Sequence, residues 1–157
     1  MKQIIQKYDQ PGTWDVVLPF TKVGQEQTWT GIIDARQPGV YELTVVATHT
    51  AQGTCGRITV RAVCGAGARV AVRGLIRIAK EAQDTDDFLE LRVLTLDKTA
   101  LATAEPELEI EANQVKASHA ASVGPVDEEQ LLYLMSRGLS RAAAIAAIIR
   151  GFCRMIK

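Results

Sequence analysis

Short runs of alternating hydrophobic and polar residues, separated by turn residues, fill the chain from Trp14 to Val123. In the runs ELTVVA and ITVRAV, aliphatic and β-branched residues alternate with polar ones, which is typical of a strand with one buried face. Glycines separate many of the runs, as turns and bends require. No convincing helical pattern occurs before Asp127, so this part of the chain is predicted to be mainly β. The expected strands lie in TWDVVLPF, TWTGIIDA, VYELTVVATH, GRITVRAVCG, ARVAVRGLIRIA, DFLELRVLTLD and ELEIEA.

Two all-β architectures fit this string of strands. One is a sandwich or barrel of antiparallel hairpins, and the other is a β-solenoid in which each turn of chain stacks on the previous one. The tight hairpin turns Asn-Gly and Asp-Gly are absent, which counts against a structure built only from hairpins. No strict sequence repeat is present either, so a solenoid would be irregular. The residues favour the solenoid slightly and leave both architectures open.

The hydrophobic period changes after Pro125 and predicts a helical hairpin. Asp127 is a suitable N-cap for a first helix, and Gly138 is placed to end that helix. Ser140 is expected to cap a second helix. Each helix has an apolar face at helical spacing, made by Leu131, Leu134 and Met135 in the first helix and by Ile145, Ile148, Ile149 and Phe152 in the second. The expected domains are therefore a β core over residues 1–124 and a helical hairpin over residues 125–157.

Composition excludes several classes of protein. The 157 residues suffice for about one domain, and 18 Lys plus Arg balance 18 Asp plus Glu. Nucleic-acid binding is not expected, because a basic footprint is missing. A membrane protein is not expected either, since no apolar run approaches the roughly 20 residues of a spanning helix. The N-terminus lacks the apolar segment of a signal peptide, and three cysteines form no even-numbered disulfide framework. These features predict a cytoplasmic location.

The sequence offers few candidates for chemistry. His119 lies among small residues just before the hairpin, and a neutral imidazole can bind a metal or act as a general base. The alternative is a histidine that is merely hydrogen-bonded at a strand end, since no metal-ligand spacing accompanies it. His49, Cys55 and Cys64 would form a soft-metal site if stacked turns brought them together, although their spacing matches no standard pattern and free cysteines are often simply buried. The acidic run Gln83–Asp87 is expected to be a solvated turn.

Three segments of the C-terminal half resemble one known family. They read RGLIRIAKEAQDTDDF, LTLDKTALATAEPELEIEANQVKASHAASVG and DEEQLLYLMSRGLSRAAAIAAIIRGF. Together, PELEI, the V-K-x-S-H unit at Val115–His119 and the DEEQLLYLMSRG hairpin resemble the C-terminal core of the SufB/SufD family, scaffold proteins of the SUF iron–sulfur cluster assembly system. The resemblance covers about half of the chain, from Gly74 to Phe152. It implies a right-handed parallel β-helix followed by a small helical region.

The resemblance also implies partners. Members of the family pair through their β-helices and dock the ATPase SufC through their helical ends. The partner-binding element would then be Asp127–Gly151, with Leu131, Met135, Ile145 and Ile149 as candidate contacts. Some of these four residues must instead pack the hairpin onto the β core. The partners expected on this basis are a SufC-like ATPase and either a second copy of the chain or a SufB-like subunit.

His119 matches the histidine of the SufD-type K-C-S-H-G motif, which the family uses in nascent-cluster assembly at the SufB–SufD interface. The chain departs from the family at the cysteine of that motif, which is Ala117 here, and at its glycine, which is Ala120. The cysteine that SufB-type proteins carry at the end of the PELEI-like segment is Ile110 here. Both thiolates, the soft ligands that iron–sulfur clusters prefer, are therefore missing from these positions.

The prediction is a minimal, non-enzymatic SufD-like scaffold subunit for iron–sulfur cluster assembly. No tightly bound cofactor is expected, and any cluster would be held transiently. The thiolates would come from a partner or from Cys55 and Cys64. The alternative prediction is a structural β-solenoid that self-associates through its edges and handles neither metal nor cluster.

Overall fold

A computed structural model describes residues 2–154. This part of the chain forms nine β-strands followed by two α-helices. The strands are β1 (Lys2–Tyr8), β2 (Gly12–Phe20), β3 (Glu26–Ala35), β4 (Gly39–His49), β5 (Cys55–Cys64), β6 (Ala68–Ile78), β7 (Thr85–Thr95), β8 (Leu101–Ile110) and β9 (Val115–Pro125). The helices are α1 (Glu128–Ser136) and α2 (Arg141–Arg154). No helix in residues 2–154 is long and apolar enough to cross a membrane.

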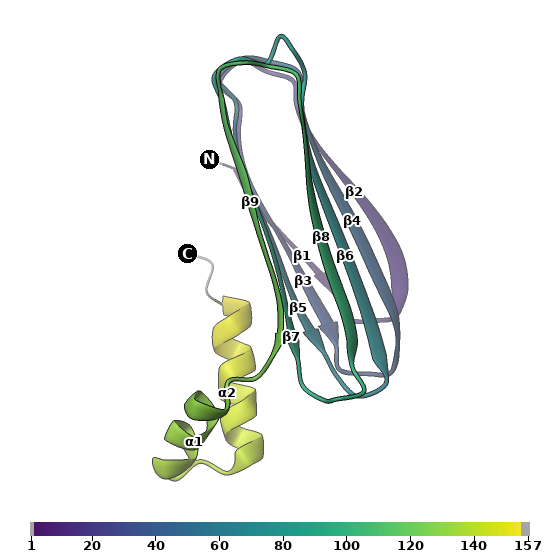
Figure 1. Cartoon of the computed structure of the whole chain (residues 1–157), viewed down its shortest axis with the longest axis vertical. Helices are drawn as coiled ribbons and strands as arrows, with labels where there is room; N and C mark the ends of the chain where they lie inside the picture. Colours follow the sequence, from purple (N-terminus) through teal and green to yellow (C-terminus); the bar gives the residue numbers. More distant parts are fainter. Residues whose placement is uncertain (1, 155–157) are drawn as a thin grey trace.

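The chain alternates between two parallel sheets, as Figure 1 shows. Sheet A contains the odd strands in the order β1-β3-β5-β7-β9, and sheet B contains the even strands in the order β2-β4-β6-β8. Thr85 pairs with Val115 on the next turn, so one turn takes about 30 residues. The molecule is a β-solenoid of about four turns, and the antiparallel sandwich is excluded. The N-terminal residues, for which the sequence predicted no strand, form β1, which pairs with β3.

The core lies between the two sheets, where equivalent positions of successive turns stack on one another. In sheet A, Trp29, Ile58 and Leu89 are aligned by the strand register and are almost completely buried. In sheet B, Leu43 stands on Val72 in the same way. Burying each such side chain contributes about 1.5–3 kcal/mol, so the alternation read from the sequence provides the main stabilising term.

The corners between the sheets also stack. The backbone N–H of Gly24 donates to the carbonyl of Gln52, and that of Gly53 donates to Gln83 on the following turn. The N–H of Asp84 repeats this bond with Gln114 one turn later. Gly53 has a φ of 63°, which favours glycine at this corner. The hydrogen-bond ladder therefore continues through the turns as well as the strands.

The hairpin has the helix ends that the sequence predicted. The Asp127 carboxylate accepts a hydrogen bond from the Glu129 N–H at 2.9 Å, and the Ser140 hydroxyl accepts one from the Ala143 N–H at 3.2 Å. Gly138 follows α1 with a φ of 96°, as expected of a helix-terminating glycine. Residues 155–157, which the sequence analysis included in the hairpin, lie outside the described residues.

The hairpin lies beside sheet A, and its two described helices do not cover the last turn of the solenoid (Figure 1). Helix α2 contacts β5, where the Arg61 guanidinium lies 5.4 Å from the centre of the Phe152 ring. The same Arg61 side chain forms a largely buried ion pair with Glu90 at 2.7 Å. A cation–π contact and an ion pair thus help to attach α2 to the outer face of sheet A.

Candidate functional site: the open end of the solenoid

Strands β8 and β9 form the last turn, and within residues 2–154 no further strand pairs with either of them. We call the core-facing side chains of these two strands the open end. They are Ala102, Ala104, Pro106, Leu108 and Ile110 on β8, and Val115, Ala117, His119, Ala121 and Val123 on β9. On the preceding turn, the equivalent residues of β6 and β7 are all buried. At the open end every such residue is half-buried or exposed, with Ile110 at 41% and Val123 at 45%.

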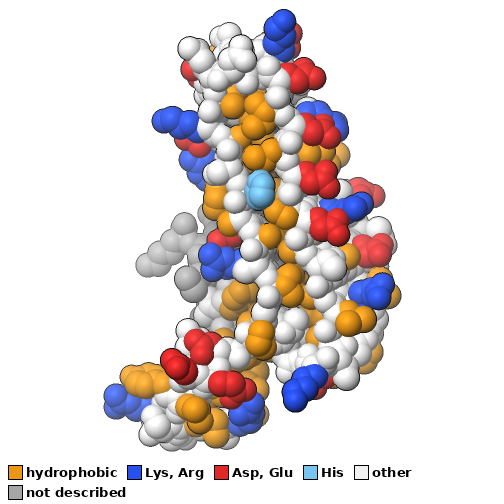
Figure 2. All heavy atoms as spheres, viewed as in Figure 1, with side chains coloured by type: hydrophobic (Ala, Val, Ile, Leu, Met, Phe, Trp, Pro, Cys, Tyr) orange, Lys and Arg blue, Asp and Glu red, His pale blue; other side chains and the backbone are white. Residues whose placement is uncertain are grey.

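His119 lies in the middle of the open end. It is aligned with Leu89, which is fully buried one turn earlier, so the strand register directs His119 toward the core face. Figure 2, which views this end of the molecule, shows a stripe of hydrophobic side chains with one histidine among them. Within the described part of the chain, the His119 side chain forms no hydrogen bond, and His119 is exposed. The structure therefore presents an imidazole on an apolar face that lacks a covering layer.

The cysteines do not join His119 or one another. Cys55 and Cys64 lie at opposite ends of β5, which separates them by about 30 Å. Cys64 is buried in the core, and burial raises the pKa of its thiol. Cys153 lies on α2, where burial also raises the thiol pKa. Among the described residues, no group of three or more His, Cys, Asp or Glu side chains is placed to hold a metal ion. The site predicted from His49, Cys55 and Cys64 is therefore not assembled.

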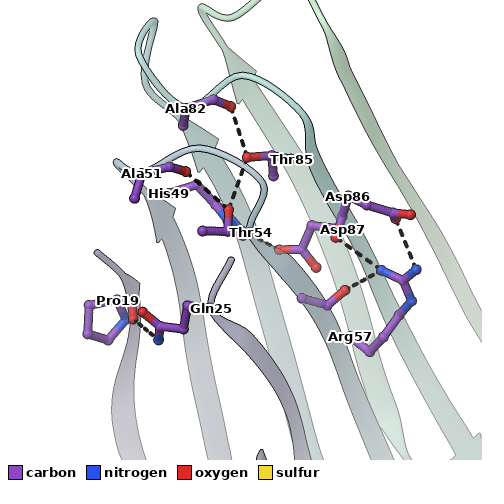
Figure 3. Close-up of polar contacts among 11 residues, drawn as sticks. Pro19, Gln25, His49, Ala51, Thr54, Arg57, Ala82, Thr85, Asp86 and Asp87 are labelled. Carbon is purple, nitrogen blue, oxygen red and sulfur yellow. Dashed lines mark hydrogen bonds and ion pairs between the residues drawn. The ribbon is translucent and has the colours of Figure 1, made fainter. Parts of the chain in front are cut away.

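His49 is instead part of a buried polar cluster at one corner of the solenoid (Figure 3). Its Nε2 lies 2.7 Å from Asp87 Oδ2, and its Nδ1 lies 2.7 Å from the Thr54 hydroxyl. The Thr54 hydroxyl is 3.0 Å from that of Thr85. The Phe20 ring stacks on the imidazole with centroids 4.2 Å apart. These residues come from successive turns, so the cluster links the turns through side chains.

Two threonine hydroxyls extend the cluster to backbone carbonyls. The Thr85 hydroxyl donates to the Ala82 carbonyl at 2.9 Å, and the Thr54 hydroxyl donates to the Ala51 carbonyl at 3.4 Å. The single hydrogen of the Thr54 hydroxyl thus has three neighbours within hydrogen-bond distance, namely His49 Nδ1, the Thr85 hydroxyl and the Ala51 carbonyl. The order Asp–His–Thr is that of a catalytic relay, but all three side chains are at most 1% exposed. A substrate cannot reach the hydroxyl, so the cluster is structural.

Gly56 makes room for the Asp87 carboxylate. A Cβ atom at this position would lie 2.5 Å from Asp87 Cγ. Asp87 Oδ1 is buried without a hydrogen-bond partner within the described residues, so the carboxylate depends on its contact with His49. The expectation that Gln83–Asp87 is a solvated turn is therefore wrong for Thr85 and Asp87, which lie in β7 and are each 1% exposed. One sequence signal indicates this burial: Asp87 occupies a core-facing position in the alternation of β7.

The apolar residues that the hairpin exposes differ from the four that the sequence analysis named as candidate partner contacts. Leu131 is 1% exposed and therefore packs inside the protein. The large exposed apolar residues of α1 are Leu132 at 62%, Tyr133 at 59% and Met135 at 37%. Ile145 and Ile149 on α2 are half-buried. Of the four candidate contacts, Met135 is thus exposed in this chain, and the docking role of all four stays a prediction.

Comparison with known proteins assigns the chain to a family. Residues 19–152 match the model of the SufBD core domain of the SUF system for iron–sulfur cluster assembly. The chain belongs to the SufBD family. This match extends the resemblance seen in the C-terminal half of the sequence to strands β3–β9 and the hairpin. It also agrees with the parallel β-solenoid followed by helices.

Its relatives include curated proteins that are named as iron–sulfur cluster assembly SufBD family proteins. A relative from Archaeoglobus fulgidus is 44% identical over 86 residues, covering 55% of this chain and 23% of the relative. One from Mycobacterium tuberculosis is 34% identical over 69% of this chain and 13% of the relative. One from Staphylococcus aureus is 34% identical over 66% of this chain and 22% of the relative. The chain thus matches less than a quarter of the length of these relatives.

Substitution of Gly56 by Ala is expected to destabilise the fold by about 1–3 kcal/mol, because the new methyl group would push Asp87 away from His49. The free energy of unfolding in urea measures this effect. Gly151→Ala is the control, since nothing lies within 4 Å of a Cβ there and alanine favours the helix. In an Asp87→Ala background the Gly56→Ala cost should shrink. An equal cost in both backgrounds would show that Asp87 is not the residue displaced.

Proposed function

We propose that the chain is a non-enzymatic scaffold subunit in iron–sulfur cluster assembly. On this proposal it pairs with another solenoid through the open end and docks a SufC-like ATPase through the hairpin. The observation that carries the proposal is the open end itself, an apolar, uncovered last turn with His119 at its centre. Family membership and the cluster-assembly names of the relatives support the same role.

Pairing is expected because the last turn has free strand edges and uncovered core-facing side chains. Strands β8 and β9 each have one free edge in the described structure, with backbone groups available for another strand. Their core-facing side chains are small or aliphatic except for His119, so a second layer could pack closely on them. A partner that is another solenoid would satisfy the backbone groups and cover the apolar side chains at the same time.

His119 would then be enclosed in the interface as a ligand or proton acceptor for a transient cluster, the cargo of the assembly. The chain offers no thiolate beside it, because Ala117 lies on the same face of β9 and Ile110 ends β8. Cys64 is buried in the core and Cys55 lies at the start of β5. The proposal therefore assigns the thiolate ligands to the partner and an imidazole to this chain.

Docking of the ATPase is assigned to the exposed apolar residues of α1, Leu132, Tyr133 and Met135. Apolar side chains that are exposed together on one short helix are suited to a protein partner. Leu131 supports the helix from its buried side.

A charge placed on the open end should prevent pairing. Ala121 and Ser122 are neighbours on β9, but only Ala121 faces the core side. Ala121→Glu is expected to weaken association at least tenfold, because a carboxylate would be desolvated in the interface. Ser122→Glu, on the outer face, should have a much smaller effect. Sedimentation velocity of the chain, alone and with a SufB-like subunit, measures the association. Equal effects of the two substitutions would contradict pairing through this face.

Leu132→Asp should abolish co-purification with a SufC-like ATPase, because it places a charge at the most exposed of the three apolar residues of α1. Val23→Asp is the matched control, since Val23 is 79% exposed in a loop of the solenoid. Both variants should keep the circular-dichroism spectrum of the native chain. A complex that survives Leu132→Asp would contradict docking through α1.

Anaerobic reconstitution with ferrous iron and sulfide separates the scaffold from a purely structural solenoid. The scaffold should give sulfide-to-iron charge-transfer absorption when a SufB-like subunit is present, and His119→Ala should reduce it. His49→Ala is not a suitable control, because it would disrupt the buried cluster. Gln114→Ala, at an exposed corner, should leave the absorption unchanged. If the native pair gives no absorption, the structural solenoid is the better description.

A further inference from the structure

The two free edges at the open end differ in charge. On its outer face, strand β9 carries Lys116 followed by small residues, Ser118, Ala120 and Ser122. On its outer face, strand β8 carries three carboxylates at alternate positions, Glu105, Glu107 and Glu109. In Figure 2 acidic side chains gather along one rim of the face, on the side where Figure 1 places β8. One edge is therefore acidic and the other nearly uncharged.

Two of the three carboxylates are neutralised within the chain. Arg73 Nε lies 2.8 Å from Glu105, and Arg77 Nε lies 2.6 Å from Glu109, both on the neighbouring strand β6. The register places Glu107 against Leu75, and the Glu107 side chain forms no hydrogen bond or direct ion pair with the residues that the structure describes, although Arg73 lies close enough to interact with it electrostatically. The middle of the β8 edge thus carries one carboxylate without a direct ion pair, between two carboxylates that each have one.

Strand β8 also contains Pro106, next to Glu107. Proline within a strand is found essentially at sheet edges, and charged side chains with proline are common devices against indiscriminate strand pairing. The β9 edge has neither device between Ser118 and Val123. The β9 edge of the open end therefore accepts many partner strands, whereas the β8 edge restricts which strand can pair with it.

We propose that β8 selects the partner of the open end: it favours a solenoid whose edge strand places a basic side chain opposite Glu107, and it disfavours a second identical copy. This inference rests on the proposed pairing through the open end. If two identical copies joined sheet to sheet about a two-fold axis, β8 would lie antiparallel to β8 of the second copy. The same outer-face row of Glu105, Glu107 and Glu109 would then face itself.

The size of the effect follows from cross-strand pair energies. Like charges directly opposite one another destabilise a strand pair, and opposite charges stabilise it by a similar amount. Replacing one carboxylate by an ammonium group opposite Glu107 should therefore strengthen association by about 2- to 30-fold. Because the outer face is exposed, this preference should decrease as the salt concentration rises.

A second copy can also be placed with β8 against β9 of its partner. Glu107 would then face the mostly uncharged outer side of β9, and the charge at position 107 would matter little. Position 107 therefore distinguishes the two arrangements.

The test uses the chain itself as the probe. A trace of fluorescently labelled native chain is titrated with unlabelled native chain, with Glu107→Lys or with Glu81→Lys, and association is followed by sedimentation velocity at low and high salt. Glu81→Lys makes the same charge change in an exposed turn between β6 and β7. Glu107→Lys should bind the native chain about 2- to 30-fold more tightly than the native chain binds itself, at low salt. Glu81→Lys should match the native chain.

Two results overturn the proposal in different ways. Equal association constants for Glu107→Lys and native chain would show that pairs form without β8 facing an acidic strand, and the proposed pairing would survive. Absence of association in every mixture, including the native chain with a SufB-like subunit, would remove the pairing and the selectivity together. Circular dichroism of each variant ensures that the comparison is between folded chains.

Discussion

The structure depends on the in-register stacking of parallel strands. Each core-facing side chain lies on the equivalent side chain of the previous turn, as Trp29, Ile58 and Leu89 do. This register also brings together the partners of the ion pairs, because Arg73 and Glu105 or Arg77 and Glu109 are separated by one turn. Without the stacking there would be neither a dry core nor a defined last turn, and His119 would have no fixed place.

Much of the fold could be predicted from the sequence, because period-2 alternation and helix caps are local signals. The runs from Trp14 onward, the cap Asp127 and the terminating Gly138 all have their expected roles. The choice between a solenoid and a sandwich was not local, because parallel pairing joins residues about 30 positions apart and leaves no hairpin signature. Strand β1 was not predicted because its residues, KQIIQKY, are mostly exposed, so the strand needs no alternation of hydrophobic and polar residues.

The buried cluster shows why the candidate metal site could not be judged from sequence. His49 and the cysteines are close in sequence, but alternation places Cys64 toward the core and Cys55 away from it, at opposite ends of one strand. The partner that His49 actually has, Asp87, is 38 positions away and belongs to a run that reads as a polar turn. Gly56 leaves space for the Asp87 carboxylate because it has no side chain, and no sequence motif indicates this role. By contrast, the family resemblance identified His119 as a candidate, and only the structure showed that His119 is exposed.

The uncovered last turn has a thermodynamic consequence. In a solenoid, stability is approximately a sum of contributions from each turn and from its contacts with nearest neighbours. Among residues 2–154, the turn made by β8 and β9 has a neighbouring turn on one side only, whereas the turn before it has two. Fraying should therefore begin at this terminal layer, and a partner that stacks on it would act as the missing neighbour. Partner binding and the local ordering of β8 and β9 are then coupled. The affinity of the open end for its partner therefore depends on how well this turn is formed before binding.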